Sequence, residues 1–417
     1  MNEVNYNKKI KLSNKIYPLF FGFSGDLLFW IAINTIFLTT VKGFSAAQIT
    51  SFTTIGNLAA IILYPISIKI IKKIGNIKSV KLGTILLLCS ALVLTFSNQY
   101  AITLIGHILY DLAFFFKNMD NVILRKNLKY EKREKEYIKV QNKSSFIYSL
   151  LTMIIAFMAG FLFNINNYLP MILCICCCVF SLILAHFLYE YKDDKYNEII
   201  EGNIKDKLSF TKIIFFILLL YASVYATIDL GQANSKLFIQ YKLSSFLDSG
   251  KVAIFLSCII AISRVVRVGS NYIFTKYCKG ENSKLLYKIG YALIIAFVCI
   301  ILGSLINFKL IGICFMALGF FVFLGTRDLF ENYMKTVLLN NCNEEYHEQA
   351  ITYLTLSRKA GKFIISGLIT LLLLKIDMLY IMILLFLIAA LNIIVIKKIY
   401  KLMNLGTEEK IILENYK

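Results

Sequence analysis

The sequence predicts an all-α polytopic membrane protein with twelve transmembrane helices in two pseudo-symmetric six-helix bundles. The first observation behind this prediction is apolar length, because about twelve stretches hold the ~20 apolar residues that a helix needs to cross a bilayer. The second is composition: 58% of the 417 residues are hydrophobic and 17% are charged, against about 25% charged in soluble chains. The third is the distribution of positive charge along the chain.

The twelve predicted helices follow one another almost without interruption. They occupy residues 16–41, 46–71, 79–98, 101–124, 144–166, 168–190, 212–235, 250–274, 285–306, 308–334, 350–374 and 378–400. The longest interruption is polar and of mixed charge, and it divides the chain into an N-terminal bundle at 1–190, a cytoplasmic linker at 191–211 and a C-terminal bundle at 212–417. This pattern predicts six helices on each side of the linker.

The two halves resemble each other in sequence. A Lys-Leu-Gly triplet at 81–83 opens the third predicted helix, and a Lys-Ile-Gly triplet at 288–290 opens the ninth. Both triplets follow a short basic segment. Such matches recur in the same order in both halves, which indicates an internal duplication of the kind found in transporters.

Positive charge is distributed unevenly across the predicted membrane. With the N-terminus inside, 35 of the 45 Lys and Arg residues fall in cytoplasmic segments, 6 in outside segments and four within helices. This excess is a strong positive-inside signal and places both termini in the cytoplasm. The net charge of +20 therefore indicates topology and contact with anionic lipid rather than a nucleic-acid partner.

The predicted location is the plasma membrane of a bacterium. The basic segment Lys8–Lys15 precedes an apolar run that is too long for a signal-peptide core, so the first helix is expected to insert without cleavage. Abundant Ile, Lys and Asn indicate an AT-rich genome, which favours a bacterial origin.

Ionisable side chains near mid-depth mark the candidate functional residues of the N-terminal half. A charge at the helix centre costs about 2.5–3.5 kcal/mol, so such a residue indicates function by default. Asp26, Trp30 and Asn34 share one face of the first predicted helix, at i, i+4 and i+8. His107 and Asp111 are i,i+4 in the fourth. We predict that these five residues bind substrate or protons; the alternative for Asp26 is a structural pair with a basic residue.

The C-terminal half has a second candidate set. Asp229 lies in the seventh predicted helix, and Arg264 and Arg267 are i,i+3 in the eighth. Arginine suits carboxylate and phosphate ligands, so these residues are predicted to bind substrate or protons. The alternative is that the two arginines are counter-ions of Asp229 or Asp26.

A third set is predicted to act at the cytoplasmic side. Three charged residues cluster near the cytoplasmic end of the tenth predicted helix, where a gate or a structural salt bridge is expected. We assign to this cytoplasmic gate Lys73, Arg327, Asp328, Glu331 and Arg358.

Other notable residues have structural interpretations. Lys117 and Asp120 are i,i+3 and are predicted to form an internal pair. The cysteines at 174 and 176–178 are interpreted as small apolar residues rather than as a soft-metal site. No Walker A sequence and no nucleophile–base or metal-ligand spacing is present. The sequence therefore predicts neither an enzyme nor a cofactor.

Between the second and third predicted helices lies a degenerate copy of a known motif. Its usual form is Gly-x-x-x-Asp-Arg-x-Gly-Arg-Arg; here Gly75, Lys73 and Lys78 match, while Ile68 and Lys72 replace the first glycine and the aspartate. With twelve helices, cytoplasmic termini and a central linker, the chain resembles the major facilitator superfamily over almost its whole length. The glycine-rich helix-five signature of the family's drug antiporters is absent.

The resemblance implies a secondary active transporter whose two bundles rock about a central site. In the family the first, fourth, seventh and tenth helices line this site. The implied partners are a small-molecule substrate and a coupling ion, which we expect to be the proton with Asp26 as the coupling carboxylate; we expect a monomer. Trp30 and the phenylalanines at 114–116 slightly favour efflux. The alternatives are uptake of a small polar nutrient and a non-transporting membrane sensor or assembly factor.

Overall fold

The computed structural model of the chain describes residues 3–191, 212–277, 284–342 and 346–415, and every regular element among them is a helix. The predicted all-α class is confirmed. The predicted linker 191–211 lies, apart from its first residue, outside the described residues.

The chain divides into two compact units. The first comprises Met1–Ile204 and Leu247–Arg264, and the second comprises Lys205–Phe246 and Val265–Lys417. The division therefore falls within α11 (Ser249–Tyr277) as well as in the segment between the two halves. The predicted bundles placed all of this helix in the C-terminal half.

Eleven helical segments in the described part of the chain are long and apolar enough to cross a bilayer. The remaining predicted span, 350–374, forms the helix α14 (His347–Leu372), which is 26 residues long. Its composition is more polar because it contains Arg358, Lys359 and Lys362. A helix of this length with three cations on it is the first indication of a charged site in the second unit.

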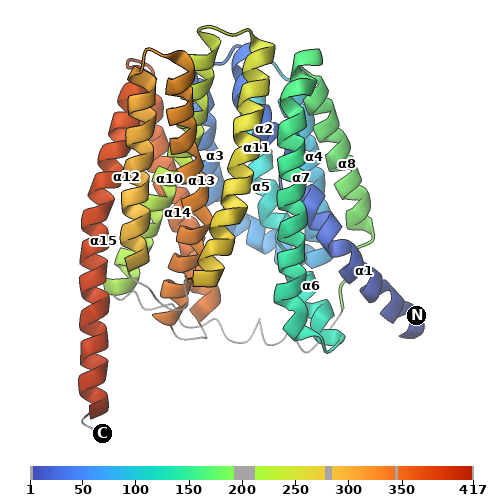
Figure 1. Cartoon of the computed structure of the whole chain (residues 1–417). Helices are drawn as coiled ribbons and strands as arrows, with labels where there is room; N and C mark the ends of the chain where they lie inside the picture. The colour runs from blue at the N-terminus through green and yellow to red at the C-terminus, as the bar shows by residue number, and fades with distance from the viewer. Residues whose placement is uncertain (1–2, 192–211, 278–283, 343–345, 416–417) are drawn as a thin grey trace. The chain divides into compact units, whose positions relative to one another are not determined.

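The first unit is built around contacts among its earliest and latest helices (Figure 1). Its elements are α1 (Glu3–Ser24), α2 (Leu28–Ile36), the π-helix η1 (Phe37–Val41), α3 (Ala46–Ile74), α4 (Asn76–Phe96), α5 (Tyr100–Lys117), α6 (Asp120–Tyr130), the 3-10 turn η2 (Glu134–Glu136), α7 (Tyr137–Ile165), α8 (Leu169–His186) and the first part of α11. Helices α1 and α2 pack on α7 and α8, while α4 packs on α5 and α8, and α3 on α5.

Two predicted helices of the first unit are broken. The first, 16–41, is interrupted at Gly25–Leu27 between α1 and α2 (Figure 1). Glycine is a poor helix former, and the Asp26 carboxylate accepts a hydrogen bond of 2.8 Å from the Leu27 amide, which competes with the helical pattern. The fourth, 101–124, is interrupted at Asn118–Met119 between α5 and α6.

The break corrects one prediction. Asp26 lies in the interruption rather than on a helix, so it does not share one continuous helical face with Trp30 and Asn34. These two residues are still one turn apart on α2.

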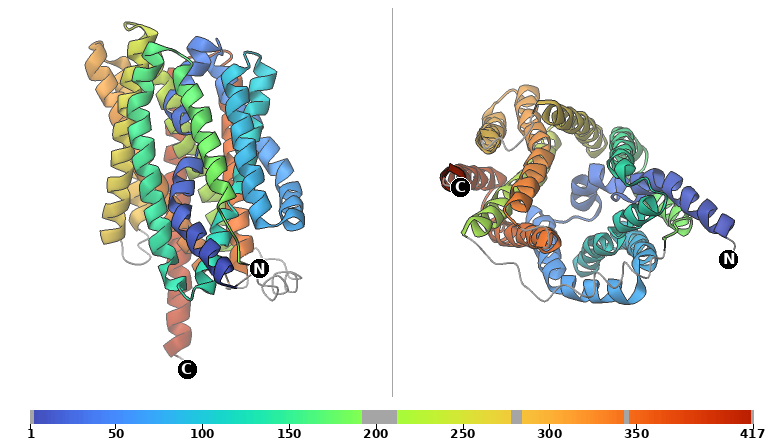
Figure 2. Two further views of the ribbon diagram at one scale, coloured as in Figure 1. Left: turned by 90° about the vertical axis from the view of Figure 1, so that its right-hand side faces the viewer. Right: turned by 90° about the horizontal axis from the view of Figure 1, so that it is seen from below.

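The helices of the second unit are continuous. They are α10 (Lys212–Ser244), the second part of α11, α12 (Lys284–Leu305), α13 (Lys309–Asn340), α14 and α15 (Met378–Asn415). Helix α10 contacts α13, α14 and α15, and α12 contacts α13 and α15. Figure 2 shows α13 and α14, in orange, beside α10, in yellow-green. Buried aromatic rings stabilise this arrangement, with Phe297 and Phe323 at 4.8 Å between centroids.

Candidate functional site

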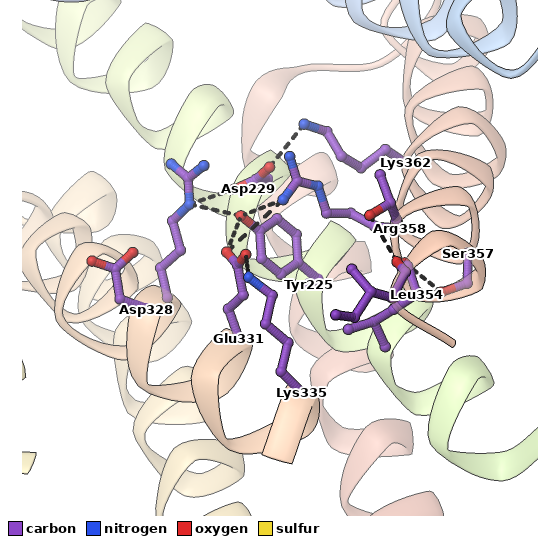
Figure 3. Close-up of polar contacts among 12 residues, drawn as sticks. Tyr225, Asp229, Asp328, Glu331, Lys335, Leu354, Ser357, Arg358 and Lys362 are labelled. Atoms are coloured by element: carbon purple, nitrogen blue, oxygen red, sulfur yellow. Dashed lines mark hydrogen bonds and ion pairs between the residues drawn. The ribbon is translucent and has the colours of Figure 1, made fainter. Parts of the chain in front are cut away.

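Three helices of the second unit bring six polar side chains together (Figure 3). Each helix contributes two residues spaced i,i+4, which places them on one face of that helix. The six, which we call the charged network, are Tyr225 and Asp229 on α10, Arg327 and Glu331 on α13, and Arg358 and Lys362 on α14.

Tyr225 is the centre of the charged network. Its side chain is fully buried. Its hydroxyl accepts hydrogen bonds from Arg327 Nε at 3.0 Å and Arg358 Nη1 at 3.2 Å. The same hydroxyl donates to Glu331 Oε2 at 3.2 Å. The Arg358 guanidinium also lies 4.6 Å from the centroid of the Tyr225 ring, which is within the range of a cation–π interaction. One neutral residue thus positions both guanidinium groups.

Asp229 is the carboxylate nearest to two cations. Lys362 Nζ donates to its Oδ2 at 2.8 Å, and Arg327 Nε lies 3.3 Å from its Oδ1. The Asp229 side chain is 10% exposed. Because an isolated buried carboxylate is costly, these two cations are what allows Asp229 to be ionised at this depth.

Glu331 is paired mainly within its own helix. Lys335 Nζ donates to Glu331 Oε1 at 2.7 Å across one helical turn. Arg358 Nη1 lies 3.9 Å from Glu331 Oε2, which is beyond hydrogen-bonding distance. Glu331 therefore stabilises Arg358 only at longer range.

Beside the network, Arg267 and Asp328 form a separate bidentate pair. Arg267 Nε and Nη2 donate to the two Asp328 oxygens at 2.6 and 2.8 Å, and Asn271 donates to Asp328 at 2.9 Å. The partner of Arg267 is thus Asp328 and neither of the suggested counter-ions. Arg264 is buried and lies three residues before Arg267 on α11.

Residues predicted for two different roles therefore meet in one place. Asp229 was assigned to substrate binding, whereas Arg327, Glu331 and Arg358 were assigned to a cytoplasmic gate, and all four lie in the charged network. Of the two remaining gate residues, Asp328 pairs with Arg267 beside the network, and Lys73 is exposed near the end of α3 in the first unit.

In the first unit, Asp26 has a specific hydrogen-bond partner. The Tyr110 hydroxyl, on α5, donates to Asp26 Oδ1 at 2.5 Å. Close by in sequence, Trp30 is 3% exposed and lies 5.7 Å from the His107 ring. His107 in turn stacks on Phe52 at 4.7 Å. Trp30 and His107 are thus part of a packed aromatic group.

Two further predicted residues lie near this group. Asp111 lies against Gly56 of α3: a Cβ added to Gly56 would come within 2.7 Å of Asp111 Oδ2. The glycine therefore leaves room for the carboxylate between α3 and α5. Asn34 is half-buried, and its side-chain oxygen accepts a hydrogen bond of 2.8 Å from the Thr35 amide.

The predicted pair of Lys117 and Asp120 is confirmed, with 3.9 Å between Lys117 Nζ and Asp120 Oδ2. It spans the break between α5 and α6. Asp120 is 0% exposed, and neither of its carboxylate oxygens has a hydrogen-bond partner within the described part of the chain. The pair is therefore a buried ion pair without further polar support.

Sequence reasoning missed the two tyrosines and one lysine. Tyr225 and Tyr110 hydrogen-bond the candidate groups, and Lys362 bonds Asp229. Lys362 lies well inside α14. The available signal was spacing, since Tyr225 precedes Asp229 by one turn and Lys362 follows Arg358 by one turn.

Comparison with known proteins gives matches in structure but none in sequence. No protein-family model and no curated protein sequence matches the chain. A bacterial homologue of the iron transporter ferroportin, in an inward-facing state, matches with a TM-score of 0.62 and 14% identity over 96% of this chain and 99% of that one. The nucleoside transporter NupG matches with a TM-score of 0.64 and 10% identity over 95% and 99%. A bacterial homologue of the human lysosomal transporter Spinster matches with 0.63 and 12% over 96% and 99%.

The chain has the major facilitator fold. Each match covers almost the whole of this chain and of the matched structure. The resemblance inferred from helix number and linker position is therefore confirmed for the fold. At 10–14% identity the likeness establishes the fold and not the solute.

Proposed function

We propose that this protein is a secondary active transporter that moves a small solute by alternating access and is driven by protons. The observation that supports this most is the charged network of the second unit. Ionisable residues within membrane-crossing helices are costly and are mostly retained for a transport pathway or a proton relay. Here α10, α13 and α14 hold two acids and three cations within contact distance of one another, on a fold shared with transporters of several solutes.

Proton coupling is assigned to Asp26. Its carboxylate is half-buried at a helix break and accepts a hydrogen bond from the neutral Tyr110 hydroxyl. Ionisable carboxylates within membrane-crossing segments are mostly retained for a transport pathway or a proton relay, and Asp26 lies close enough to Lys117 for the two charges to interact. One proton crossing 100 mV supplies about 2.3 kcal/mol, which is sufficient for tens-fold accumulation of solute.

We propose efflux as the direction, in the plasma membrane of a bacterium, by a monomer with both termini in the cytoplasm. Half-buried Phe114 and Phe115 offer apolar contact to a solute. Trp30 supports this less than its sequence position suggested, because its ring is packed against His107. Uptake of a polar nutrient is the alternative, and transport assays in both directions decide between the two.

The test begins with purified protein, screened against metabolites and antimicrobials for thermal stabilisation at two pH values. A ligand at 100 times its dissociation constant should add about 2.7 kcal/mol to the free energy of unfolding. Ligands that stabilise are then tested in proteoliposomes with and without an imposed pH gradient. We expect one chemical class to be transported, and faster with the gradient. Binding without exchange across the membrane would contradict transport and indicate a sensor.

Coupling is tested with Asp26→Asn and the matched control Asp248→Asn. Asp248 is a surface carboxylate of the same unit, 58% exposed and paired with Lys251. We expect Asp26→Asn to abolish the effect of the pH gradient and Asp248→Asn to leave it intact. An unchanged gradient effect in Asp26→Asn would show that another group carries the proton.

A further inference from the structure

Positive charge is in excess around the charged network. Two carboxylates and four cations lie within it or bonded to it; they are Asp229 and Glu331, and Arg327, Lys335, Arg358 and Lys362. An unmatched charge inside a membrane-crossing bundle is strongly unfavourable. Two positive charges therefore lack a matching carboxylate in this group of residues.

The excess can be assigned to two arginines. Lys335 and Lys362 each donate a hydrogen bond to a carboxylate. By contrast, Arg327 and Arg358 both donate to the Tyr225 hydroxyl, which is neutral. Their nearest carboxylate contacts are looser, at 3.3 Å from Arg327 to Asp229 and 3.9 Å from Arg358 to Glu331.

Polar atoms in the network also lack hydrogen bonds. Among the residues that the structure describes, Arg358 Nε and Asp229 Oδ1 are both buried and have no hydrogen-bond partner. A guanidinium group presents parallel N–H donors that match the two oxygens of a carboxylate or phosphate. Arg358 Nε is thus a donor without an acceptor among the described residues.

The two arginines are both accessible and held in place. Their side chains are 27% and 28% exposed, so a solute can reach them. Tyr225 beneath them is fully buried and bonds both guanidinium groups. A binding group that is already held in position loses little conformational entropy when its ligand arrives.

We propose that Arg327 and Arg358, positioned by Tyr225, bind the carboxylate or phosphate group of a small anionic solute, with Lys362 as a further cation at the site. This inference rests on the proposed transport function and names the class of its substrate. The entering anion replaces the loose contacts of Asp229 and Glu331 with the two guanidinium groups. Binding therefore changes ion pairs among α10, α13 and α14, which links occupancy to the arrangement of these helices.

The experiment measures thermal unfolding of the full chain in neutral detergent with three probes: succinate, inorganic phosphate and, as a cation, choline. The variants are Arg358→Gln, Arg327→Gln and the matched control Arg133→Gln. Arg133 is an arginine of the first unit, 49% exposed and paired with Glu131 and Glu136. Unfolding without ligand shows whether each variant is folded.

We expect succinate or phosphate, but not choline, to stabilise the wild type and Arg133→Gln. In Arg358→Gln and Arg327→Gln the affinity for that anion should fall at least about tenfold, which corresponds to the loss of a charged hydrogen bond. Arg358→Lys keeps the positive charge but loses the parallel N–H donors of the guanidinium group. Its affinity for the anion should therefore lie between those of the wild type and Arg358→Gln. Equal anion affinity in wild type and Arg358→Gln, or stabilisation by choline alone, would overturn the proposal.

A phosphate group can also come from a lipid. A parallel series adds phosphatidylglycerol or phosphatidylcholine to the detergent in place of the soluble probes. We expect soluble anions to stabilise the protein without phosphatidylglycerol. If only phosphatidylglycerol stabilises it, and Arg358→Gln removes that effect, the site binds a lipid headgroup and the proposal is wrong.

The same variants separate this inference from the proposed function. Transport of a neutral or cationic solute that is unchanged in Arg358→Gln would refute the anion site and leave the transporter assignment standing. Anion binding that requires Arg358, in a protein that exchanges no solute, would refute the transporter assignment and leave the site standing.

Discussion

The first and second units place their acids in different settings. In the first unit, two membrane-crossing segments are broken, at Gly25–Leu27 and at Asn118–Met119, and Asp26 and Asp120 lie at these breaks. In the second unit, helices α10 and α13 are unbroken over 33 and 32 residues, and Asp229 and Asp328 on them are paired with cations from other helices.

This difference shows that two units of one chain can present different ionisable groups. The Asp26 carboxylate bonds to a neutral hydroxyl, and Asp120 is buried with a single lysine at 3.9 Å. Acids within membrane-crossing segments are mostly retained for a transport pathway or a proton relay. The charged network of the second unit has more cations than acids, which suits an anionic solute. We therefore propose that the first unit couples protons and that the second binds the solute.

The largest expected effect concerns Asp120, because it is fully buried. Asp120→Asn should lower the free energy of unfolding by about 3 kcal/mol, since it leaves the Lys117 ammonium buried without a counter-charge. The double variant Lys117→Met/Asp120→Leu should lose less than about 1 kcal/mol, because apolar residues of similar volume replace the pair. Denaturation in detergent measures both. A double variant as unstable as the single one would show that the pair itself stabilises the break.

The second effect concerns Asp229, which is 10% exposed. Asp229→Asn leaves Arg327 and Lys362 without their nearest carboxylate, and we expect a loss of about 2 kcal/mol, less than for a fully buried pair. The exposed pair of Asp248 and Lys251 provides the control, because Asp248→Asn, which removes a charge from an exposed ion pair, should change stability far less. If the two variants were equally stable, the network would not support the second unit.

The third effect tests how closely α4 packs on the break after α5. A Cβ added to Gly83 would meet the Lys117 amide nitrogen at 2.5 Å and the Ala113 carbonyl at 2.6 Å. Gly83→Ala should therefore destabilise the protein by about 1.5 kcal/mol through overpacking. Gly269→Ala, on α11 in the second unit, meets nothing within 4 Å and should gain up to about 1 kcal/mol from helix propensity. Thermal melts measure the stability of both variants. Equal changes in melting temperature, or a Gly83→Ala variant more stable than Gly269→Ala, would contradict this prediction.

The smallest effect is a dependence on pH at Lys42, just after the first membrane-crossing segment. Its ammonium donates to the Thr95 carbonyl at 2.6 Å and the Asn98 side chain at 3.0 Å, and burial lowers the pKa of Lys42 to about 8. Between pH 8 and the unfolded pKa near 10.5, the unfolded chain binds more protons than the folded one. Stability should therefore rise with pH across this window.

The control for this prediction is Lys42→Met, which has no proton to release. Melting temperatures between pH 7 and pH 10 should rise in the wild type relative to Lys42→Met. If the melting temperatures of the two proteins changed equally with pH, the pKa of Lys42 would not be lowered by its burial.

Much of the fold was predictable from sequence, because bilayer thickness dictates the length of the apolar helices. The pairing of Lys117 and Asp120 was predictable too, since i,i+3 spacing alone brings them together. The break at Asp26 was not, because a single glycine in an apolar run is compatible with a continuous helix. The break depends on the hydrogen bond from the Leu27 amide to Asp26, which no periodicity indicates.

The charged network was predictable only in part. Asp229 and Arg327 stand out as ionisable residues within apolar runs. Their meeting with Arg358 depends on α14 packing beside α10, which is tertiary information. Tyr225 gave no signal of its own, because it is one of 25 tyrosines, and its role follows from the two arginines that bond it.

The most direct test of the division between the units measures two properties of Asp26→Asn. One is its affinity for the anion that stabilises the wild type, and the other is proton movement on addition of that anion to proteoliposomes containing a pH-sensitive dye. The division predicts an affinity within about twofold of wild type, as expected for an energetically independent site, and no anion-driven proton movement. A variant that loses anion binding and proton movement together, or keeps both, would contradict it.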